Sequence, residues 1–349
     1  MNRRSAVVLL LLATATVAFA RPGAAAPIKW IAVNLGVHSF GHLSAPDAIV
    51  ARAATDAVGF ECGKPSACTS PQPSGGCGCI DTLPQGPTAV DVASNGSVWV
   101  LDGVKHRLLA WQRGHSRAAP LPADVGDSDF VLGRNGTIYV FGGNVHGKPY
   151  LYMYALTPTG TVRWKAATTV GSSQARLVLA WDGSIYSVGP SATPTWTPLT
   201  TPAGRPLPLS TQRRRSSHLQ PLARDLRLLT TQVSEREVHF ALVDGRGTVV
   251  RAWRVTSRTS LEVGRLVPSL VGGDLVAGIG VYQGKKSETV VIRLGASGPT
   301  RSRITLDGRA VWDPGGTTAR STLRIAADGR LYQLRTDPAK GVTVARYRL

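Results

Sequence analysis

Four cysteines, Cys62, Cys68, Cys77 and Cys79, lie within eighteen residues. Because the segment is rich in Gly, Pro and Ser and the count is even, we predict two disulfides. One residue separates Cys77 from Cys79, which disfavours a bridge between them. Two of the three possible connectivities remain, both joining Cys62 and Cys68 crosswise to the later pair. A metal site is a weaker alternative, since this spacing matches no standard zinc arrangement; free redox thiols are the other.

Histidines are the remaining candidates for chemistry. His38 and His42 are spaced i, i+4, which places two imidazoles on one face of a helix, although the intervening Gly41 indicates a loop. His106 belongs to a strand-like segment and His146 to a loop. We name these four histidines as candidate metal or acid–base residues and favour a structural role for each. The chain has no nucleophile elbow, zinc-protease helix or phosphate loop, so we assign no catalytic residue and predict no cofactor.

The N-terminus predicts the compartment in which any such residues act. Arg3 and Arg4 precede an apolar stretch, and Ala18-Phe19-Ala20 provides a small-x-small cleavage pattern. We therefore predict a signal peptide over residues 1–20, with a cut as late as residue 26, and a secreted, extracellular protein. No later stretch has 18 uninterrupted apolar residues, so the mature chain is predicted to lack a transmembrane segment.

A recurring hairpin is the strongest pattern in the chain. Four segments contain Asn-Gly or Asp-Gly, dipeptides that favour tight turns because both turn positions take positive φ. Each dipeptide follows a short apolar run and precedes alternating aliphatic and aromatic residues, as paired strands require. The glycines of the four dipeptides are Gly96, Gly136, Gly183 and Gly329.

The spacing of these glycines predicts the architecture. Successive intervals are 40, 47 and 146 residues, and the last interval has room for two further, degenerate copies. We place them at residues 226–243 and 266–281, each as the first two strands of a unit. Six units of four strands describe an all-β, six-bladed β-propeller, formed as one domain by residues 27–349.

The region before the first repeat supplies two more predictions. Residues 28–35 resemble a strand, and the last unit ends after its third strand at Leu349; pairing the two closes the ring and removes exposed edges. Residues 37–85 form an insert. Ser44, Asp47 and Pro46 fit the start of a helix over about residues 45–58, which Gly59 ends. The Cys-rich loop follows this helix.

Residues 86–109 resemble an NHL repeat. They contain an apolar strand with Asp91, the Asn95-Gly96 turn, a second strand ending at Asp102, and a His106-Arg107 pair. Residues 151–164 and 247–253 are similar to PQQ-like repeats. These resemblances imply the propeller fold more than an activity, because propellers of these kinds include scaffolds, lyases, hydrolases and dehydrogenases.

The net charge of +19 is uneven along the chain. Residues 201–349 contain 25 basic and 11 acidic residues, whereas residues 27–200 contain 12 and 10. Scattered arginine is typical of solvated strand faces, and a docking face for an anionic polymer is the alternative. Export argues against a nucleic-acid partner.

Two functions of different class follow. The absence of a catalytic constellation favours a monomeric module that binds a protein or a cell-envelope glycan. The alternative is a lyase or hydrolase, metal-dependent or not, with its site at one mouth of the central channel. A 50-residue insertion departs most from the repeat, so we expect the insert to contribute to binding or to cap the ring.

Overall fold

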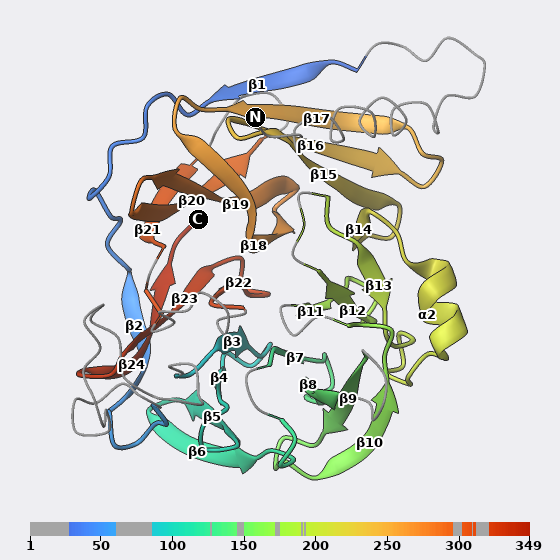
Figure 1. The fold of residues 1–349 in the computed structure, drawn as a ribbon, viewed down its shortest axis with the longest axis vertical. Coiled ribbons are helices and arrows are strands. Elements are labelled where there is room, and N and C mark those ends of the chain that lie inside the picture. The colour runs from blue at the N-terminus through green and yellow to red at the C-terminus, as the bar shows by residue number, and fades with distance from the viewer. Residues whose placement is uncertain are drawn as a thin grey trace, which may run out of the picture.

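A computed structural model describes residues 28–60, 86–125, 128–144, 150–171, 175–189, 191, 193–295, 302–308, 310–311 and 321–349. The predicted signal peptide, the four cysteines and His146 lie outside the described residues. In the described part, six sheets surround a central axis (Figure 1), and all their strand pairs are antiparallel except one. The predicted all-β, six-bladed propeller is therefore confirmed.

The first three sheets follow one another along the chain. Blade I contains β3 (Ala89–Val92), β4 (Val98–Asp102), β5 (Arg107–Gln112) and β6 (His115–Pro120). Blade II contains β7 (Phe130–Leu132), β8 (Ile138–Asn144), β9 (Leu151–Leu156) and β10 (Val162–Ala167). Blade III contains β11 (Arg176–Leu179), β12 (Ile185–Val188) and β13 (Trp196–Pro198). In each blade the first strand is the innermost.

The other three sheets complete the ring. Blade IV contains β14 (Leu219–Ala223), β15 (Leu226–Ser234), β16 (Glu237–Asp244) and β17 (Val249–Thr256). Blade V contains β18 (Ser260–Val271), β19 (Asp274–Gln283), β20 (Lys286–Leu294) and β21 (Ser302–Asp307). Blade VI contains β22 (Leu323–Ile325), β23 (Leu331–Asp337) and β24 (Gly341–Tyr347). The degenerate copy at 266–281 is the first hairpin of blade V. The copy at 226–243 is the second hairpin of blade IV, one strand later than predicted.

The four Asn-Gly and Asp-Gly turns join first to second strands, as predicted, but with a different backbone. In the first turn, the Gly96 amide donates to the Ala93 carbonyl (2.9 Å) and Asn95 Oδ1 accepts from the Ser97 amide (3.0 Å). Gly96 has φ +79°, whereas Asn95 has no positive φ. This is a three-residue hairpin loop, in which only the glycine takes the left-handed conformation.

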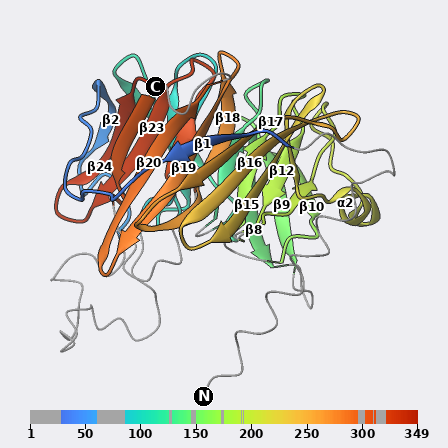
Figure 2. The same ribbon diagram turned by 90° about the horizontal axis from the view of Figure 1, so that it is seen from above.

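The predicted closure by residues 28–35 is wrong. These residues contain β1 (Trp30–Asn34), which pairs in parallel with β17 and becomes the outermost strand of blade IV (Figures 1 and 2). The last blade is instead completed by β2 (Ala48–Ala53), antiparallel to β24. The ring is thus closed by an N-terminal segment, but by the second of its two strands.

The predicted helix over residues 45–58 is also wrong. Residues 48–53 are strand β2, and Ser44 and Thr305 exchange hydrogen bonds through the Ser44 amide and hydroxyl instead of capping a helix. The exposed edge of β24 offers backbone partners, and Ile49 and Val50 are β-branched residues that suit a strand. The helix of the described part is α2 (Leu209–Arg215), after the third strand of blade III.

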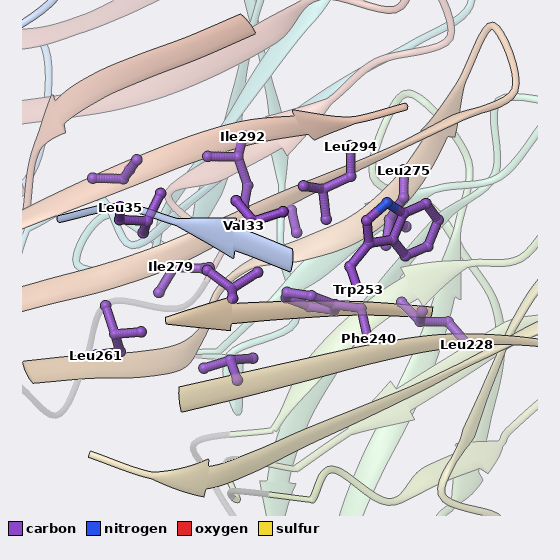
Figure 3. Close-up of a cluster of buried hydrophobic side chains, with 14 of the residues drawn as sticks. Val33, Leu35, Leu228, Phe240, Trp253, Leu261, Leu275, Ile279, Ile292 and Leu294 are labelled. Carbon is purple, nitrogen blue, oxygen red and sulfur yellow. The ribbon is translucent and has the colours of Figure 1, made fainter. Parts of the chain in front are cut away.

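The core consists of apolar layers between neighbouring blades. Figure 3 shows the layer between blades IV and V, where Trp253, Phe240 and Ile279 are buried. Val33 and Leu35 of the N-terminal segment join this layer. No helix in the described part is long and apolar enough to cross a membrane.

Residues 28–53 form what we call the outer strap, which runs along blades IV, V and VI. Its β1 lies on blade IV and its β2 on blade VI. Between them, the Gly36 carbonyl accepts from the Arg258 amide (2.9 Å), and the Ser44 amide donates to the Thr305 carbonyl (2.8 Å). The outer strap therefore joins three consecutive blades from the outside of the ring.

Candidate functional site in the central channel

A cavity of about 910 Å³ lies where the inner strands of all six blades meet. Its lining comes from β3, β7, β11, β14, β18 and β22 and, except after β14, from the turns that follow these strands. The cavity therefore opens on the face that carries the first-to-second-strand turns. A concave site with mostly apolar walls and few polar groups is the usual form of a ligand pocket.

Its walls are largely aliphatic, with Val131, Leu179 and Ile325 among the lining residues. Trp181 also lines the cavity, from the turn after β11, and its side chain is 40% exposed. The backbone carbonyl of Trp181 accepts a hydrogen bond from the guanidinium of Arg134, a lining residue from the neighbouring blade. An aromatic surface and a cationic group thus stand together in the wall.

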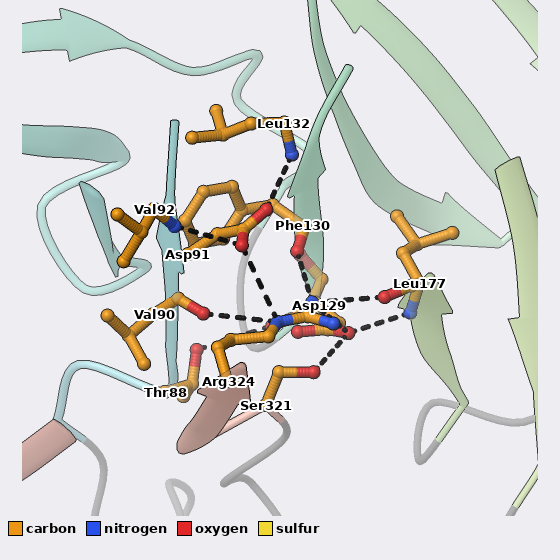
Figure 4. A network of polar contacts seen from close by, with 11 residues as sticks. Thr88, Val90, Asp91, Val92, Asp129, Phe130, Leu132, Leu177, Ser321 and Arg324 are labelled. Atoms are coloured by element: carbon orange, nitrogen blue, oxygen red, sulfur yellow. Dashed lines mark hydrogen bonds and ion pairs between the residues drawn. The ribbon is translucent and has the colours of Figure 1, made fainter. Parts of the chain in front are cut away.

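Arg324, on β22, is the centre of a buried polar network (Figure 4). Its Nη2 donates to the carbonyls of Phe130 (2.9 Å) and Leu177 (3.0 Å), and its Nε to that of Val90 (3.3 Å). These carbonyls belong to blades I, II and III. One side chain of the last blade therefore contacts each of the first three.

Two carboxylates accompany this guanidinium. Asp91 accepts from the amides of Val92 (2.9 Å) and Leu132 (2.7 Å), and Asp129 accepts from the amide of Leu177 (2.7 Å). Their oxygens lie 3.9 Å (Asp91) and 3.5 Å (Asp129) from Arg324 nitrogens.

The hydroxyl of Ser321 also donates to Asp129, at 2.7 Å. We call Arg324, Asp91, Asp129 and Ser321 the inner seam. Its bonds satisfy edge groups of the inner strands, which have no neighbour on the channel side.

The carboxylates of Asp91 and Asp129 differ in whether a ligand in the channel can reach them. Asp129 is fully buried, and its Oδ1 has no hydrogen-bond partner within the described residues. Asp91 lines the cavity, together with Arg324. Burial raises the pKa of Asp91 above its ordinary value, more than Arg324 and the two amides lower it. Asp91 is therefore the acidic group of the seam that a channel ligand can reach.

The predicted candidate residues do not gather at this site. His38 is buried on the outer strap beside blade V, and His106 lies on blade I, where its Nδ1 is 3.0 Å from the Val125 carbonyl oxygen. His42 is exposed. No cluster of three His, Cys, Asp or Glu residues that could hold a metal occurs in the described part of the chain.

His38 has a well-defined structural role. Arg303 Nη2 lies 2.8 Å from its Nδ1, and because arginine only donates, Nδ1 must accept. The proton is therefore on Nε2, which donates to Glu288 Oε2 at 2.6 Å. Glu288 Oε1 accepts from the Gly41 amide (2.7 Å), so this cluster fixes the outer strap to blade V.

The sequence did not predict the inner seam. Asp91 was noticed only as a feature of the NHL-like unit, and Arg324 is one basic residue in an arginine-rich half. A usable signal was the repeat register, because the pairs Asp91–Leu132 and Asp129–Leu177 are separated by about one unit. When a polar side chain on one inner strand bonds to the inner strand of the next blade, the two residues are about one repeat apart in the sequence.

Comparison with known proteins adds the following. No protein-family model and no curated protein matches the chain, so the NHL-like resemblance stays a prediction. Among solved structures, the chain is similar to the PQQ-bound aldose sugar dehydrogenase of Streptomyces coelicolor, with 11% identity, coverage of 74% of this chain and 93% of that chain, and a TM-score of 0.42.

It is also similar to a virginiamycin B lyase of Staphylococcus aureus, with 12% identity, coverage of 74% and 80%, and a TM-score of 0.36. A gluconolactonase of Xanthomonas campestris has 11% identity, coverage of 87% and 99%, and a TM-score of 0.39. At these identities and TM-scores we take nothing about activity from them, and function must be argued from the site.

Proposed function

We propose that this protein is a binding module that takes the end of a glycan into the central channel. One observation carries the proposal: a cavity of about 910 Å³ whose apolar wall includes the exposed ring of Trp181 beside Arg134. A sugar ring has apolar C–H faces that pack on an aromatic surface, and hydroxyl groups that bond to polar side chains and backbone groups. Both kinds of partner line this cavity.

The polar side chains that line the cavity suit the same ligand. Arg324 and Asp91 line the cavity and offer a donor and an acceptor. The inner strands are the channel-side edges of their sheets, so backbone groups add further partners. The predicted signal peptide supports a glycan ligand, because an exported protein meets the polysaccharides of the cell envelope.

Isothermal titration calorimetry with soluble oligosaccharides tests the proposal. The panel contains a neutral glucan hexamer and a galacturonic acid hexamer. We expect at least one to bind, and Trp181→Ala to weaken that binding at least tenfold, through loss of stacking and apolar contact. Trp30→Ala is the matched control. Trp30 has a similar exposed fraction, 37%, but it lies on β1, the outermost strand of blade IV and not in the channel lining. Equal effects of the two variants would exclude the channel as the site.

An enzyme is the second candidate, and the raised pKa of Asp91 is the observation that favours it. A carboxyl that retains its proton closer to neutral pH can serve as a general acid for a leaving group. Against this, Asp91 already accepts two backbone hydrogen bonds, and the one from the Leu132 amide joins blades I and II. The binding reading is therefore better supported.

Product analysis separates the two candidates. Each bound oligosaccharide is incubated with the protein, and new reducing ends or unsaturated sugars are measured. We expect no turnover. Cleavage that is lost in a folded Asp91→Asn variant would replace the binding module by the enzyme.

A further inference from the structure

A second cavity, of about 510 Å³, adjoins the channel between blades VI and I. Its lining includes Arg52 of β2, Trp111 of β5 and Arg113 from the turn after β5. Asp328, in the turn after β22, lines both this cavity and the channel cavity. A ligand whose end occupies the channel can therefore continue past Asp328 into this space, which we call the interblade groove.

The interblade groove carries a positive charge that the protein does not neutralise. Arg52 and Arg113 are exposed, and neither has an ion pair within the described residues. Arg346, also in the lining, is already paired with Asp47 at 3.2 Å. The acidic lining residue Asp328 is paired with Arg330 at 4.0 Å and accepts from the Tyr332 hydroxyl at 2.9 Å. Two arginines therefore remain available to an anionic ligand.

Arg113 occupies a conformation that does not suit it. Its φ is +50°, and the next residue, Gly114, has φ +83°. The two-residue turn between the first and second strands of blade V has nearly the same backbone but is made of glycines, Gly272 and Gly273, at φ +58° and +82°. Asparagine or glycine adopts this conformation with less strain than arginine does. A strained side chain at the rim of a cavity is a reason to look for a function.

The groove also has an apolar wall. Trp111 is partly exposed, and Ile49 of β2, which also lines the groove, is 41% exposed. The combination of an indole ring, an aliphatic side chain and separate guanidinium groups suits a chain of sugar rings that carry carboxylates. Each ring packs its C–H face on the wall, and each carboxylate takes a bidentate hydrogen-bonded contact from an arginine.

We infer that the ligand is a linear acidic polysaccharide, with its end in the channel and its carboxylates on Arg113 and Arg52 in the interblade groove. The inference rests on the proposed glycan-binding function and specifies its ligand class. A nucleic acid is less suited, because its dense phosphates are usually met by a longer series of basic side chains. A flat membrane surface fits a concave groove between two blades poorly.

The substitution Arg113→Asn tests the inference in two opposite directions. Asparagine relieves the strain of the turn, so we expect the midpoint of thermal unfolding to rise by about 1 to 2 °C. The same change removes a carboxylate partner, so affinity for a galacturonic acid decamer should fall about five- to tenfold. Affinity for a neutral glucan decamer should not change. Arg52→Gln should weaken only the acidic decamer, independently of the turn.

Arg258→Gln is the matched control. Arg258 is exposed in the connection between blades IV and V, on the opposite face of the ring from the cavity, and removing it changes the net charge by the same amount. Equal losses for Arg258→Gln and Arg113→Asn would overturn the inference, as would tighter binding of a single-stranded DNA 12-mer than of the acidic decamer. Equal binding of both decamers would support glycan binding in the channel and contradict the acidic ligand. Binding of neither decamer would contradict both proposals.

Discussion

The two halves of the ring are held together in different ways. Blades I, II and III are joined to blade VI by the inner seam, in which a single buried guanidinium reaches carbonyls of three other blades. Blades IV, V and VI are joined by the outer strap, mainly through backbone pairing and one His38–Glu288 contact. In the seam, one side chain makes most of the contacts between blades, whereas in the strap the contacts are distributed along 26 residues. We therefore expect disruption of the seam to lower the global stability of the protein, and disruption of a strap contact to cause only local unfolding.

Removal of the guanidinium should have the largest effect. In Arg324→Met, Asp91 and Asp129 lose their compensating charge and three buried carbonyls lose a donor. Breaking a buried ion pair from one side typically costs about 3–5 kcal/mol, and urea unfolding should show a loss in this range. Arg346→Met, in the same blade, should cost about 0.5 kcal/mol because its pair with Asp47 is partly exposed. Similar losses for both variants would show that Arg324 has no special role.

Removal of the strap contact should have an intermediate and local effect. His38→Ala leaves Glu288 with its bond from the Gly41 amide but without the imidazole. An unsatisfied buried group costs about 1–3 kcal/mol, and we expect this loss as faster amide hydrogen exchange over residues 35–47. The inner-strand amides of Leu132 and Leu177 should keep their protection.

The exposed His218 provides the control for this measurement. His218→Ala should leave exchange of the strap unchanged. Exchange that increases equally at the strap and at the inner strands of His38→Ala would mean that the strap is part of the global unfolding unit. The distinction between seam and strap would then be lost.

The same distinction explains how much the sequence predicted. Hairpins could be located because Asn95-Gly96 and its equivalents determine local turn geometry, and the number of blades followed from their spacing. The destinations of residues 28–35 and 45–58 could not be predicted, since each depends on a distant strand edge, β17 or β24, with no local signature. A helical pattern around Ile49 was overridden by pairing across the chain.

The candidate site was less predictable than the fold. The mouth of the central channel was predicted only as the place of an enzyme site, and neither Trp181 nor Arg324 carries a motif. Arg324 is chemically the same as many solvated arginines of the second half, and only its burial distinguishes it. The histidines, which did have a suggestive spacing, turned out to be separate: His38 is buried in the strap and His42 is exposed.

The smallest predicted effect is on the pH dependence of the free energy of unfolding, and we expect opposite signs for Asp91 of the seam and Glu237 of blade IV. For Asp91 in the seam, burial raises the pKa above the ordinary value of 3.8. The folded state then binds this proton more tightly than the unfolded state does. Its contribution to stability is present below the unfolded pKa and is lost as pH rises through the folded pKa. The free energy of unfolding of the parent minus that of Asp91→Asn should therefore decrease as pH rises above 3.8.

Glu237, on blade IV beside the strap, should show the opposite sign. Burial raises the pKa of its carboxyl, but hydrogen bonds from Arg254 and His239 outweigh burial and hold the pKa below the ordinary value of 4.5. Its contribution is present above that value and is lost as pH falls through the folded pKa. The parent minus Glu237→Gln difference should therefore increase with pH in the acidic range. Urea unfolding at closely spaced pH values measures both curves. Two curves of the same sign would mean that Asp91 of the seam and Glu237 of blade IV do not differ electrostatically, because only a carboxyl destabilised by burial loses its contribution as it ionises.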